Sequence, residues 1–523
     1  MYKSDNCTNR TDYIPAGGVH GLDTIIQHLA ALDVMDQLPH ELQDLVATYL
    51  DGRDLVAMSG VCRAWYRVAH NIAQCKKHDV TVHIRLDGTK AQHPIHRVWD
   101  GLMIKSIAPR EIVDVSALGN VHTLDLASTN VVDVSSLGGV HTLNLRFCER
   151  IVDVSALGGV HKLNLAYCKG VVDVSALGRV HTLSLCGCGR VSDVSALGGV
   201  HALTLKECDS VVDVSALGTV HTLDLSDCNR LVDVSALRGV HTLNLSWCNG
   251  VVDVSALGGV HTLDLNWCKG VVDVSALGGV HTLDLSDCHR VVDVSALGGV
   301  HTLNLSYCIN VMDVSALGNV HTLYLTRCKD VVDVSALGGV HTLYLIYCLG
   351  VVDVSAIGGV HTLNLASTNV VDVSALGGVH SLDLSWCKNV VDVSALGGVH
   401  TLSLSRCKNV IDVSALGRVH TLDLNRTNVA DVSALGGVHT LNLRFCDGVV
   451  DVSALGGVHT LSLRGCECVS DVSSLGGVYD LDLNGCPNVV DASALGGVYR
   501  LNLNHTGVRD VSALGRVHDL ILL

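Results

Sequence analysis

The chain has 523 residues, a formal net charge of −16 at pH 7, and 48% hydrophobic but only 3% aromatic residues. This composition predicts a folded protein with an aliphatic core. No run of about 18 apolar residues occurs, so we expect no membrane span. The first residues lack the apolar stretch of a signal peptide, so we expect an intracellular, cytoplasmic protein (the host cytoplasm for a viral chain), with a nuclear location left open.

The charge is unevenly distributed along the chain. Residues 1–110 carry 12 basic and 12 acidic residues, whereas the remainder carries 23 basic and 39 acidic ones. Because 21 of those acids belong to one repeated element, the acidity indicates turn chemistry and not a broad surface for a basic partner. No basic stripe with interleaved aromatic residues occurs, so we do not expect nucleic-acid binding.

Residues 1–33 form a leader of uncertain order, and residues 34–75 then show the spacing of short helices. Leu38, Leu42, Leu45 and Tyr49 recur at steps that place them on one face of a helix. On spacing alone, this segment is either a binding domain or a small helical cap that shields the end of the following domain.

The same segment contains an ordered motif. A Leu-Pro pair opens it, Tyr-Leu and Asp-Leu pairs follow, and Val-Cys-Arg-x-Trp closes it. In order and spacing the motif resembles the F-box, a helical domain that binds the adaptor Skp1 and so joins a cullin-type ubiquitin ligase. The resemblance implies an adaptor-binding site formed by Leu38, Pro39, Leu42, Leu45, Tyr49, Leu55, Val61, Cys62 and Trp65.

Residues 76–112 connect this segment to a repeat array and are expected to cap the array. Val80, Val82, Ile84 and Leu86 alternate as in a strand, and residues 102–104 resemble a degenerate first coil.

A candidate zinc site lies at the end of the helical segment and in the connector. Cys75 and His78, with His93 and His96, have the spacing of zinc ligands. The chain is rich in His, however, and Pro94 separates the last pair, so the spacing leaves zinc binding open and we predict no metal site.

From residue 113 onward, one unit recurs. The element Asp-Val/Ala-Ser occurs 21 times, mostly 20 residues apart, and four coils are one residue shorter, those in which Thr replaces the repeat Cys: Thr129, Thr368, Thr427 and Thr506. This period with Leu-x-Leu-x-x-Cys resembles the leucine-rich repeat, in a short form with a tight convex turn. We therefore predict an α/β repeat solenoid. A small helical F-box-like domain precedes about 21 coils over residues 113–523, with a parallel concave sheet, short convex turns and gentle curvature.

The coil formed by residues 241–260 illustrates the expected packing. Asp253 and Ser255 are short acceptors for backbone N–H groups at a turn, and Gly258-Gly259 is expected to permit the reversal into the next strand. No coil can bury its apolar face alone, so stacking must supply the core. Alternation and steps of three predict the inward-facing residues Leu243, Leu245, Cys248, Val251, Val254, Leu257 and Val260.

Two repeated positions carry reactive side chains. Sixteen of the 21 cysteines share one coil position, and 19 coils begin their strand with His. We predict buried, reduced thiols and a histidine ladder that forms a solvated rim, although such a row is also able to bind metal or sense pH. Each of these residues recurs from coil to coil as part of the repeated scaffold, so we predict neither catalysis nor a cofactor.

A protein target is expected to bind where the coils differ. Aromatic and Arg side chains are the usual interface anchors; the alternative is a scattered set of tolerated surface residues. We expect Tyr324 and Tyr344 to lie about 5 Å apart on the concave face. The predicted target-binding residues are Trp247, Trp267, Tyr324, Arg327, Tyr344, Tyr347, Trp386 and Arg406.

Together these features predict a substrate receptor of a Skp1–cullin–F-box ubiquitin ligase. Its partners would be a Skp1-like adaptor, a cullin through that adaptor, and a protein target. The alternatives are a structural or interaction repeat protein with a vestigial F-box, or a decoy that sequesters the adaptor. Because no coil follows residues 519–523, we also expect self-association through the C-terminal coil, or its fraying.

Overall fold

The structure is a computed structural model that describes residues 81–82, 103–105, 115–116, 118–119 and 121–522. The chain divides into two compact units, Met1–Cys168 and Lys169–Leu523, and we describe each by itself. The nine predicted adaptor-binding residues lie outside the described residues, as do Cys75, His78, His93 and His96.

In the first unit, short strands pair in parallel and in chain order. Short strands occur at residues 81–82 and 103–105 of the connector, whereas Val80, Ile84 and Leu86 of the expected strand lie outside the described residues. The elements are β1 (Thr81–Val82), β2 (Met103–Lys105), β3 (Thr123–Asp125), η3 (Ser135–Gly139), β4 (Thr142–Asn144), η4 (Ser155–Gly159) and β5 (Lys162–Asn164).

In the second unit, every strand pairs in parallel with the strand of the next coil, without a register shift. Thr262, Leu263 and Asp264, for example, lie opposite Thr282, Leu283 and Asp284. The strands are β6 (Thr182–Ser184), β7 (Ala202–Thr204), β8 (Thr222–Asp224), β9 (Thr242–Asn244), β10 (Thr262–Asp264), β11 (Thr282–Asp284), β12 (Thr302–Asn304), β13 (Thr322–Tyr324), β14 (Thr342–Tyr344), β15 (Thr362–Asn364), β16 (Ser381–Asp383), β17 (Thr401–Ser403), β18 (Thr421–Asp423), β19 (Thr440–Asn442), β20 (Thr460–Ser462), β21 (Asp480–Asp482), β22 (Arg500–Asn502) and β23 (Asp519–Ile521).

Opposite the strands, each coil of this unit forms one short 3₁₀ helix, as the short repeat predicts. These helices are η5 (Ser175–Leu177), η6 (Ser195–Gly199), η7 (Ser215–Leu217), η8 (Ser235–Gly239), η9 (Ser255–Gly259), η10 (Ser275–Gly279), η11 (Ser295–Gly299), η12 (Ser315–Asn319), η13 (Ser335–Gly339), η14 (Ser355–Ile357), η15 (Ser374–Gly378), η16 (Ser394–Gly398), η17 (Ser414–Leu416), η18 (Ser433–Gly437), η19 (Ser453–Gly457), η20 (Ser473–Gly477), η21 (Ser493–Gly497) and η22 (Ser512–Leu514).

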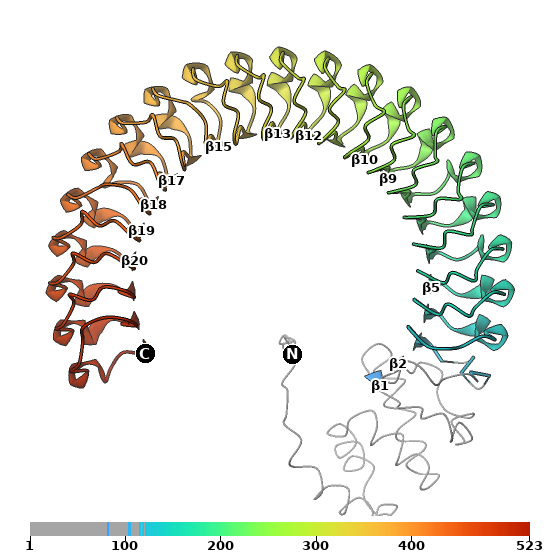
Figure 1. The fold of residues 1–523 in the computed structure, drawn as a ribbon, viewed down its shortest axis with the longest axis horizontal. Helices are drawn as coiled ribbons and strands as arrows, with labels where there is room; N and C mark the ends of the chain where they lie inside the picture. The colour runs from blue at the N-terminus through green and yellow to red at the C-terminus, as the bar shows by residue number, and fades with distance from the viewer. Residues whose placement is uncertain (1–80, 83–102, 106–114, 117, 120, 523) are drawn as a thin grey trace, which may run out of the picture. The chain divides into compact units, whose positions relative to one another are not determined.

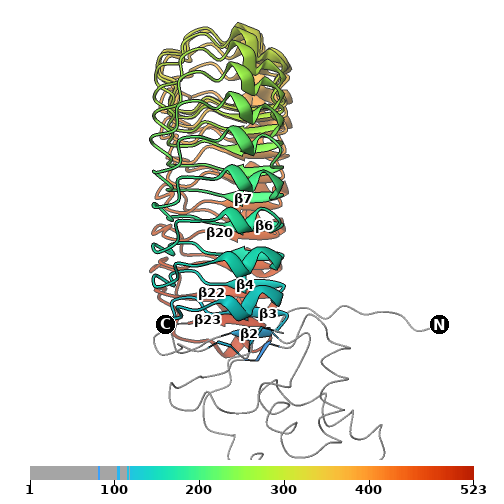
Figure 2. The ribbon, with the colours of Figure 1, turned by 90° about the vertical axis from the view of Figure 1, so that its right-hand side faces the viewer.

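Within residues 169–523 the coils form an arc with the strands on its concave side and the 3₁₀ helices on its convex side (Figure 1). Seen from the convex side, the 3₁₀ helices of successive coils stack in a single file (Figure 2). The expected gentle curvature is wrong, because the arc bends strongly. The hydrogen-bonded strands hold the concave side at about 4.8 Å per coil, and the bulkier 3₁₀ helices spread the convex side further apart.

The core consists of one aliphatic set repeated in every coil. The seven residues predicted to point inward between positions 241 and 260 are each at most 1% exposed. Because each set is completed by the sets on either side, the stacked coils share one continuous core, as predicted.

The convex turn is held by the repeated Asp. Asp253 Oδ1 accepts a 2.9 Å hydrogen bond from the Ser255 backbone N–H. Bonds from the Ser255 hydroxyl and backbone hold the pKa of this carboxyl below its usual range. Asp253 is the acceptor that we predicted, whereas Ser255 acts as a donor.

The role predicted for the glycine pair is wrong. In this part of the chain, the glycines with positive φ are Gly187, Gly465 and Gly485, and none of them belongs to a repeat pair. Instead, a Cβ on Gly258 would lie 2.2 Å from the Ala276 carbonyl oxygen of the next coil. The first glycine therefore allows close approach of neighbouring coils, although Arg238 takes its place in one coil, and the chain reverses at this turn without a left-handed residue.

Candidate functional site

The variable surface of the array is built on one unusual backbone position. After each strand the chain turns, and the Cys248 N–H donates to the Leu245 carbonyl at 3.1 Å. The third residue of this turn, Trp247, has a φ of 66°, a conformation that turns of this kind normally give to Gly or Asn. We call the residue directly before the repeat Cys or Thr the left-handed position. A non-glycine residue there is destabilising by roughly 1–2 kcal/mol.

Large side chains nevertheless occupy the left-handed position in many coils. Six of the eight predicted target-binding residues lie there: Trp247, Trp267, Arg327, Tyr347, Trp386 and Arg406. The prediction missed Tyr307, Arg426 and Phe445, which occupy the same position. An alignment of the repeats to one another would have found them.

Neighbouring side chains at the left-handed position stack on one another. The Trp247 and Trp267 ring centroids are 4.5 Å apart, with planes 5° from parallel. The Arg327 Cζ atom lies 5.4 Å from the Tyr307 ring centroid and 4.8 Å from that of Tyr347. Stacked aromatic and guanidinium groups with exposed faces form a suitable surface for a protein partner.

The other two predicted target-binding residues lie elsewhere, on the strands. Tyr324 and Tyr344 end β13 and β14 and face each other in register. Their ring centroids are 4.7 Å apart, with planes 4° from parallel, which confirms the expected spacing of about 5 Å. The predicted residues thus form two groups, one on the sheet and one along the left-handed position.

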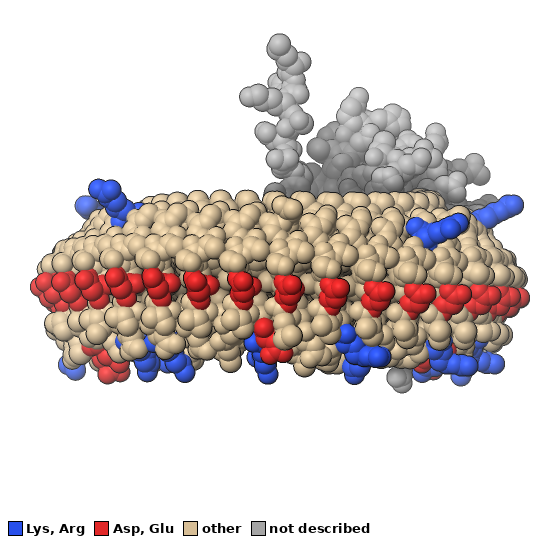
Figure 3. All heavy atoms as spheres, turned by 90° about the horizontal axis from the view of Figure 1, so that it is seen from above, with Lys and Arg blue, Asp and Glu red and all other residues tan. Residues whose placement is uncertain are grey.

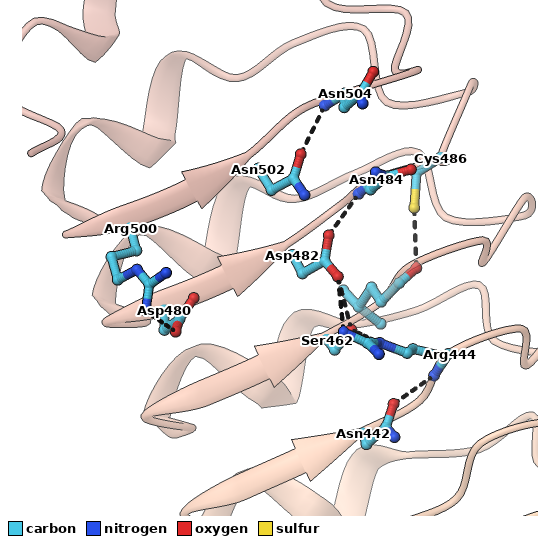
Figure 4. A network of polar contacts seen from close by, with 11 residues as sticks. Asn442, Arg444, Ser462, Asp480, Asp482, Asn484, Cys486, Arg500, Asn502 and Asn504 are labelled. Atoms are coloured by element: carbon cyan, nitrogen blue, oxygen red, sulfur yellow. Dashed lines mark hydrogen bonds and ion pairs between the residues drawn. The ribbon is translucent and has the colours of Figure 1, made fainter. Parts of the chain in front are cut away.

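Polar side chains cover most of the remaining sheet and bond to each other across coils. Asp482 Oδ1 accepts from the Asn484 N–H at 3.1 Å, and Asp482 Oδ2 accepts from Ser462 at 3.2 Å and from Arg444 at 3.3 Å. Arg500 pairs with Asp480 at 3.5 Å and with Asp519 at 3.2 Å. Figure 4 shows Arg444 and Arg500 directed toward these carboxylates, so both cations are already compensated.

The histidine ladder lies on an exposed rim at the start of the strands. Its imidazoles stack, for example His301 on His321 with centroids 4.6 Å apart, and His301 Nδ1 lies 3.3 Å from Thr302 Oγ1. Partial desolvation and the neighbouring imidazoles His281 and His321 lower the pKa of His301. Parallel rings at this separation cannot direct two nitrogens at one zinc ion, whose bonds to nitrogen are about 2.0–2.1 Å long.

The described cysteines are free, and those at the repeat position are buried. The Cys248 thiol donates to the Leu225 carbonyl of the preceding coil at 3.1 Å. Burial raises the pKa of the Cys228 thiol to about 12. The structure therefore agrees with the prediction of buried thiols, and a thiol with this pKa is a poor nucleophile at neutral pH.

The repeated Asp residues form a single acidic row along the convex surface of residues 169–523 (Figure 3). Each carboxylate is occupied by its own turn, as at Asp273 with the Ser275 N–H at 2.9 Å. In the part of the chain that the structure describes, no three His, Cys, Asp or Glu side chains converge as metal ligands. Among the same residues, no helix has the length and apolar character needed to span a bilayer.

Comparison with known proteins gives a family match for the N-terminal segment. Residues 35–74 match the family described as F-box-like. A search of curated proteins found no match for the chain.

Solved structures match the array at low sequence identity. TLR13 in its complex with ssRNA13 is 17% identical with a TM-score of 0.50, over 81% of this chain and 74% of that one. The mouse RP105/MD-1 complex is 14% identical with a TM-score of 0.48, over 85% and 82%. The functional domain of InlJ from Listeria monocytogenes, which includes a cysteine ladder, is 17% identical with a TM-score of 0.32, over 75% and 71%.

At 17% identity the likeness to TLR13 shows the fold alone, a leucine-rich-repeat solenoid. The chain thus combines a segment at residues 35–74 that matches the F-box-like family with a repeat array that has the leucine-rich-repeat fold. The F-box-like match beside a repeat array of this fold supports a protein-interaction role.

Proposed function

We propose that this chain is the target-recognition subunit of a Skp1–cullin–F-box ubiquitin ligase. Residues 35–74 would bind a Skp1-like adaptor and, through it, a cullin, while the array holds a protein target. The chain itself would perform no chemistry, since holding the target near a conjugating enzyme is sufficient to accelerate transfer. The assembly would act in the cytoplasm or the nucleus.

The observation that carries the proposal is the F-box-like match at residues 35–74. The array supplies the second element that a receptor needs, an exposed surface that differs from coil to coil. At the left-handed position the chain retains Trp, Tyr, Phe and Arg despite the backbone cost. Such strain persists where a side chain is needed for function, and here it supports target binding.

Adaptor binding tests the proposal directly. Purified Skp1 should bind residues 34–523 and fail to bind residues 113–523. Exchanging Leu38 and Pro39 together for Ala should abolish binding, and Trp65→Ala should weaken it by about 3–5 kcal/mol, as loss of a large aromatic side chain usually does. Val252→Ala, at a position 54% exposed in the array, is the matched control and should bind like the wild type.

The same experiment separates the alternatives. Equal binding by residues 34–523 and 113–523 would exclude the ligase role and leave a structural repeat protein. Adaptor binding without ubiquitination of any bound target, in a reconstituted ligase, would instead identify a decoy that sequesters the adaptor.

A further inference from the structure

The array contains a groove along the left-handed position between β16 and β21. Its volume is about 1060 Å³, and it runs from Trp386 to Gly485 past the ends of successive strands. At about 4.8 Å per coil the groove is roughly 24 Å long, the length of about seven residues of extended chain.

Two glycines create the hollow. Gly465 and Gly485, with φ of 70° and 74°, stand at the left-handed position where most coils carry a side chain. The Phe445 ring lies over Gly465, because a Cβ there would be 2.5 Å from Phe445 Cδ1. Gly485 is open, since a Cβ there would approach nothing closer than 3.6 Å. The backbone of Gly485 therefore forms part of the groove floor.

The groove is lined by more positive than negative side chains. Of the ion pairs between described residues, none involves its five cations, in contrast to Arg444 and Arg500 on the sheet. Two acidic residues, Asp447 and Glu467, also line it. The cations are Lys388, Arg406, Lys408, Arg426 and Arg464.

Aromatic rings hold two of the guanidinium groups in place. Arg406 Cζ lies 4.2 Å from the Trp386 ring centroid, and Arg426 Cζ lies 4.5 Å from that of Phe445. A guanidinium stacked on a ring keeps the N–H groups at its edge free for an oxyanion, and its orientation is fixed before binding.

We propose that this groove binds an extended acidic segment of the protein target. Carboxylate or phosphate oxygens would pair with Arg406, Arg426 and Arg464. The inference rests on the proposed function, of which it specifies the substrate class. A peptide fits better than single-stranded RNA, because a peptide can place neutral residues opposite Asp447 and Glu467, whereas RNA places a phosphate at every nucleotide.

The stacking of Arg side chains on Trp386 and Phe445 also favours a peptide over single-stranded RNA. Single-stranded nucleic acid binds through free aromatic faces on which bases stack. Here an Arg occupies one face of each ring, so the groove offers charge more than stacking surface.

Fluorescence anisotropy with the full chain tests the proposal. One labelled octapeptide carries Glu at alternate positions around a central Phe, a second has Gln in place of Glu, and a third has phosphoserine in place of two Glu. A labelled octamer of uridylate is the competing probe. The Glu or phosphoserine peptide should bind at least about tenfold tighter than the Gln peptide and weaken with added salt. The tighter of the two anionic peptides identifies carboxylate or phosphate as the natural source.

Matched variants locate the binding. Gly485→Trp should fill the groove and be accommodated at the strain cost of the left-handed position, since Trp247 occupies the same backbone position with φ of 66°. Gly187→Trp makes the same change at a position with φ of 69° outside the groove. Lys408→Glu has its counterpart in Lys329→Glu, at the equivalent place in a coil outside the groove. The two groove variants should lose at least about tenfold in affinity, and the two controls should retain wild-type binding. Gly485→Trp and Gly187→Trp should lower the melting temperature to a similar extent, because both place a side chain at the left-handed position.

Three results would overturn the inference. They are equal binding of the Glu and Gln peptides, unaltered binding by Gly485→Trp and Lys408→Glu, and preference for the RNA probe. Skp1 binding by the same preparation distinguishes a failure of this inference from a failure of the proposed function, because the adaptor would bind the F-box-like segment and not the groove.

Discussion

Gly258 and Ala276 lie in backbone contact across neighbouring coils, with 2.2 Å between the place of a Gly258 Cβ and the Ala276 carbonyl oxygen. The relationship recurs along the array, for example between Gly278 and Ala296 at 2.3 Å. Gly259 is less constrained than Gly258, since a Cβ on it would be 3.6 Å from the Arg238 oxygen, whereas a Cβ on Gly279 in the next coil would be 2.9 Å from the Gly258 oxygen.

The two glycines should therefore respond differently to the same substitution. Gly258→Ala forces the coils apart and should destabilise the array by about 1–3 kcal/mol, as overpacking does. Gly259→Ala makes only ordinary contact and should be nearly neutral. Urea unfolding followed by circular dichroism measures both, and equal stability of the two variants would show that coil spacing adjusts freely.

The histidine ladder should make the array less stable in mild acid. The pKa of His301, His361 and His400 is lowered by desolvation and by neighbouring imidazoles, so the unfolded chain takes up protons more readily. Stability is then fully present above the unfolded value near 6.5 and falls as pH drops below it. The melting temperature should be lower at pH 5.5 than at pH 7.5.

Substitution by Tyr provides the control for this pH effect. Tyr479 and Tyr499 already take part in the stack, with centroids 4.7 Å apart. Changing His301 and His361 to Tyr should reduce the pH dependence without breaking the ladder. Because the pKa of Asp253 is lowered from 3.8, its contribution is lost only at a more acidic pH. A flat melting profile between pH 7.5 and 5.5 would contradict the prediction.

The thiols should differ sharply in reactivity. Burial raises the pKa of Cys228 and Cys407 to about 12, whereas Cys468 is exposed. Iodoacetamide at pH 7.5, followed by peptide mass spectrometry, should label Cys468 before the repeat thiols, which should react only after unfolding. Equal labelling of Cys468 and Cys228 in the folded protein would mean that the coils open readily.

The two groups of aromatic residues should contribute separately to target binding. Tyr324→Ala with Tyr344→Ala removes the pair on the sheet, and Trp247→Ser with Trp267→Ser removes a stack at the left-handed position. Ser is accepted at that position, since Ser367 has φ of 60°. Each pair should reduce quantitative co-purification of the target, whereas Val252→Ala should not. Unchanged recovery for both pairs would leave them as tolerated surface residues.

The terminal coil should mediate contact between copies of this chain. Ile521 and Leu522 are 42% and 43% exposed, and among the described residues β23 pairs only with β22. Exposed strand edges recruit further strands, so light scattering should detect association of residues 1–523. Ile521→Lys with Leu522→Asp should abolish it, and Ile411→Lys, at a position 64% exposed, should not. The prediction of self-association would be refuted if the wild type and the variants were all monomers with equal hydrogen-exchange protection of the last coil.

The sequence predicted the parts of the coil that depend on local pattern. The inward direction of Leu243 and Val254 follows from alternation and from steps of three, and the Asp253 turn follows from short-range hydrogen bonding. The reason for Gly258 and the curvature depend on contacts between coils, which no single repeat contains. The positive φ of Trp247 could not be predicted either, because Trp is not a residue that indicates this conformation.

Successive strands pair without a register shift, as Leu263 does with Leu283. The interfaces between neighbouring coils are therefore nearly identical. Loss or duplication of one whole repeat by recombination would then create no mismatch. The separation along the array between the Tyr324–Tyr344 pair and the groove at Arg426 can thus change by inheritance in increments of about 4.8 Å. The distance between the tyrosine pair and the groove can therefore evolve without a change in either surface.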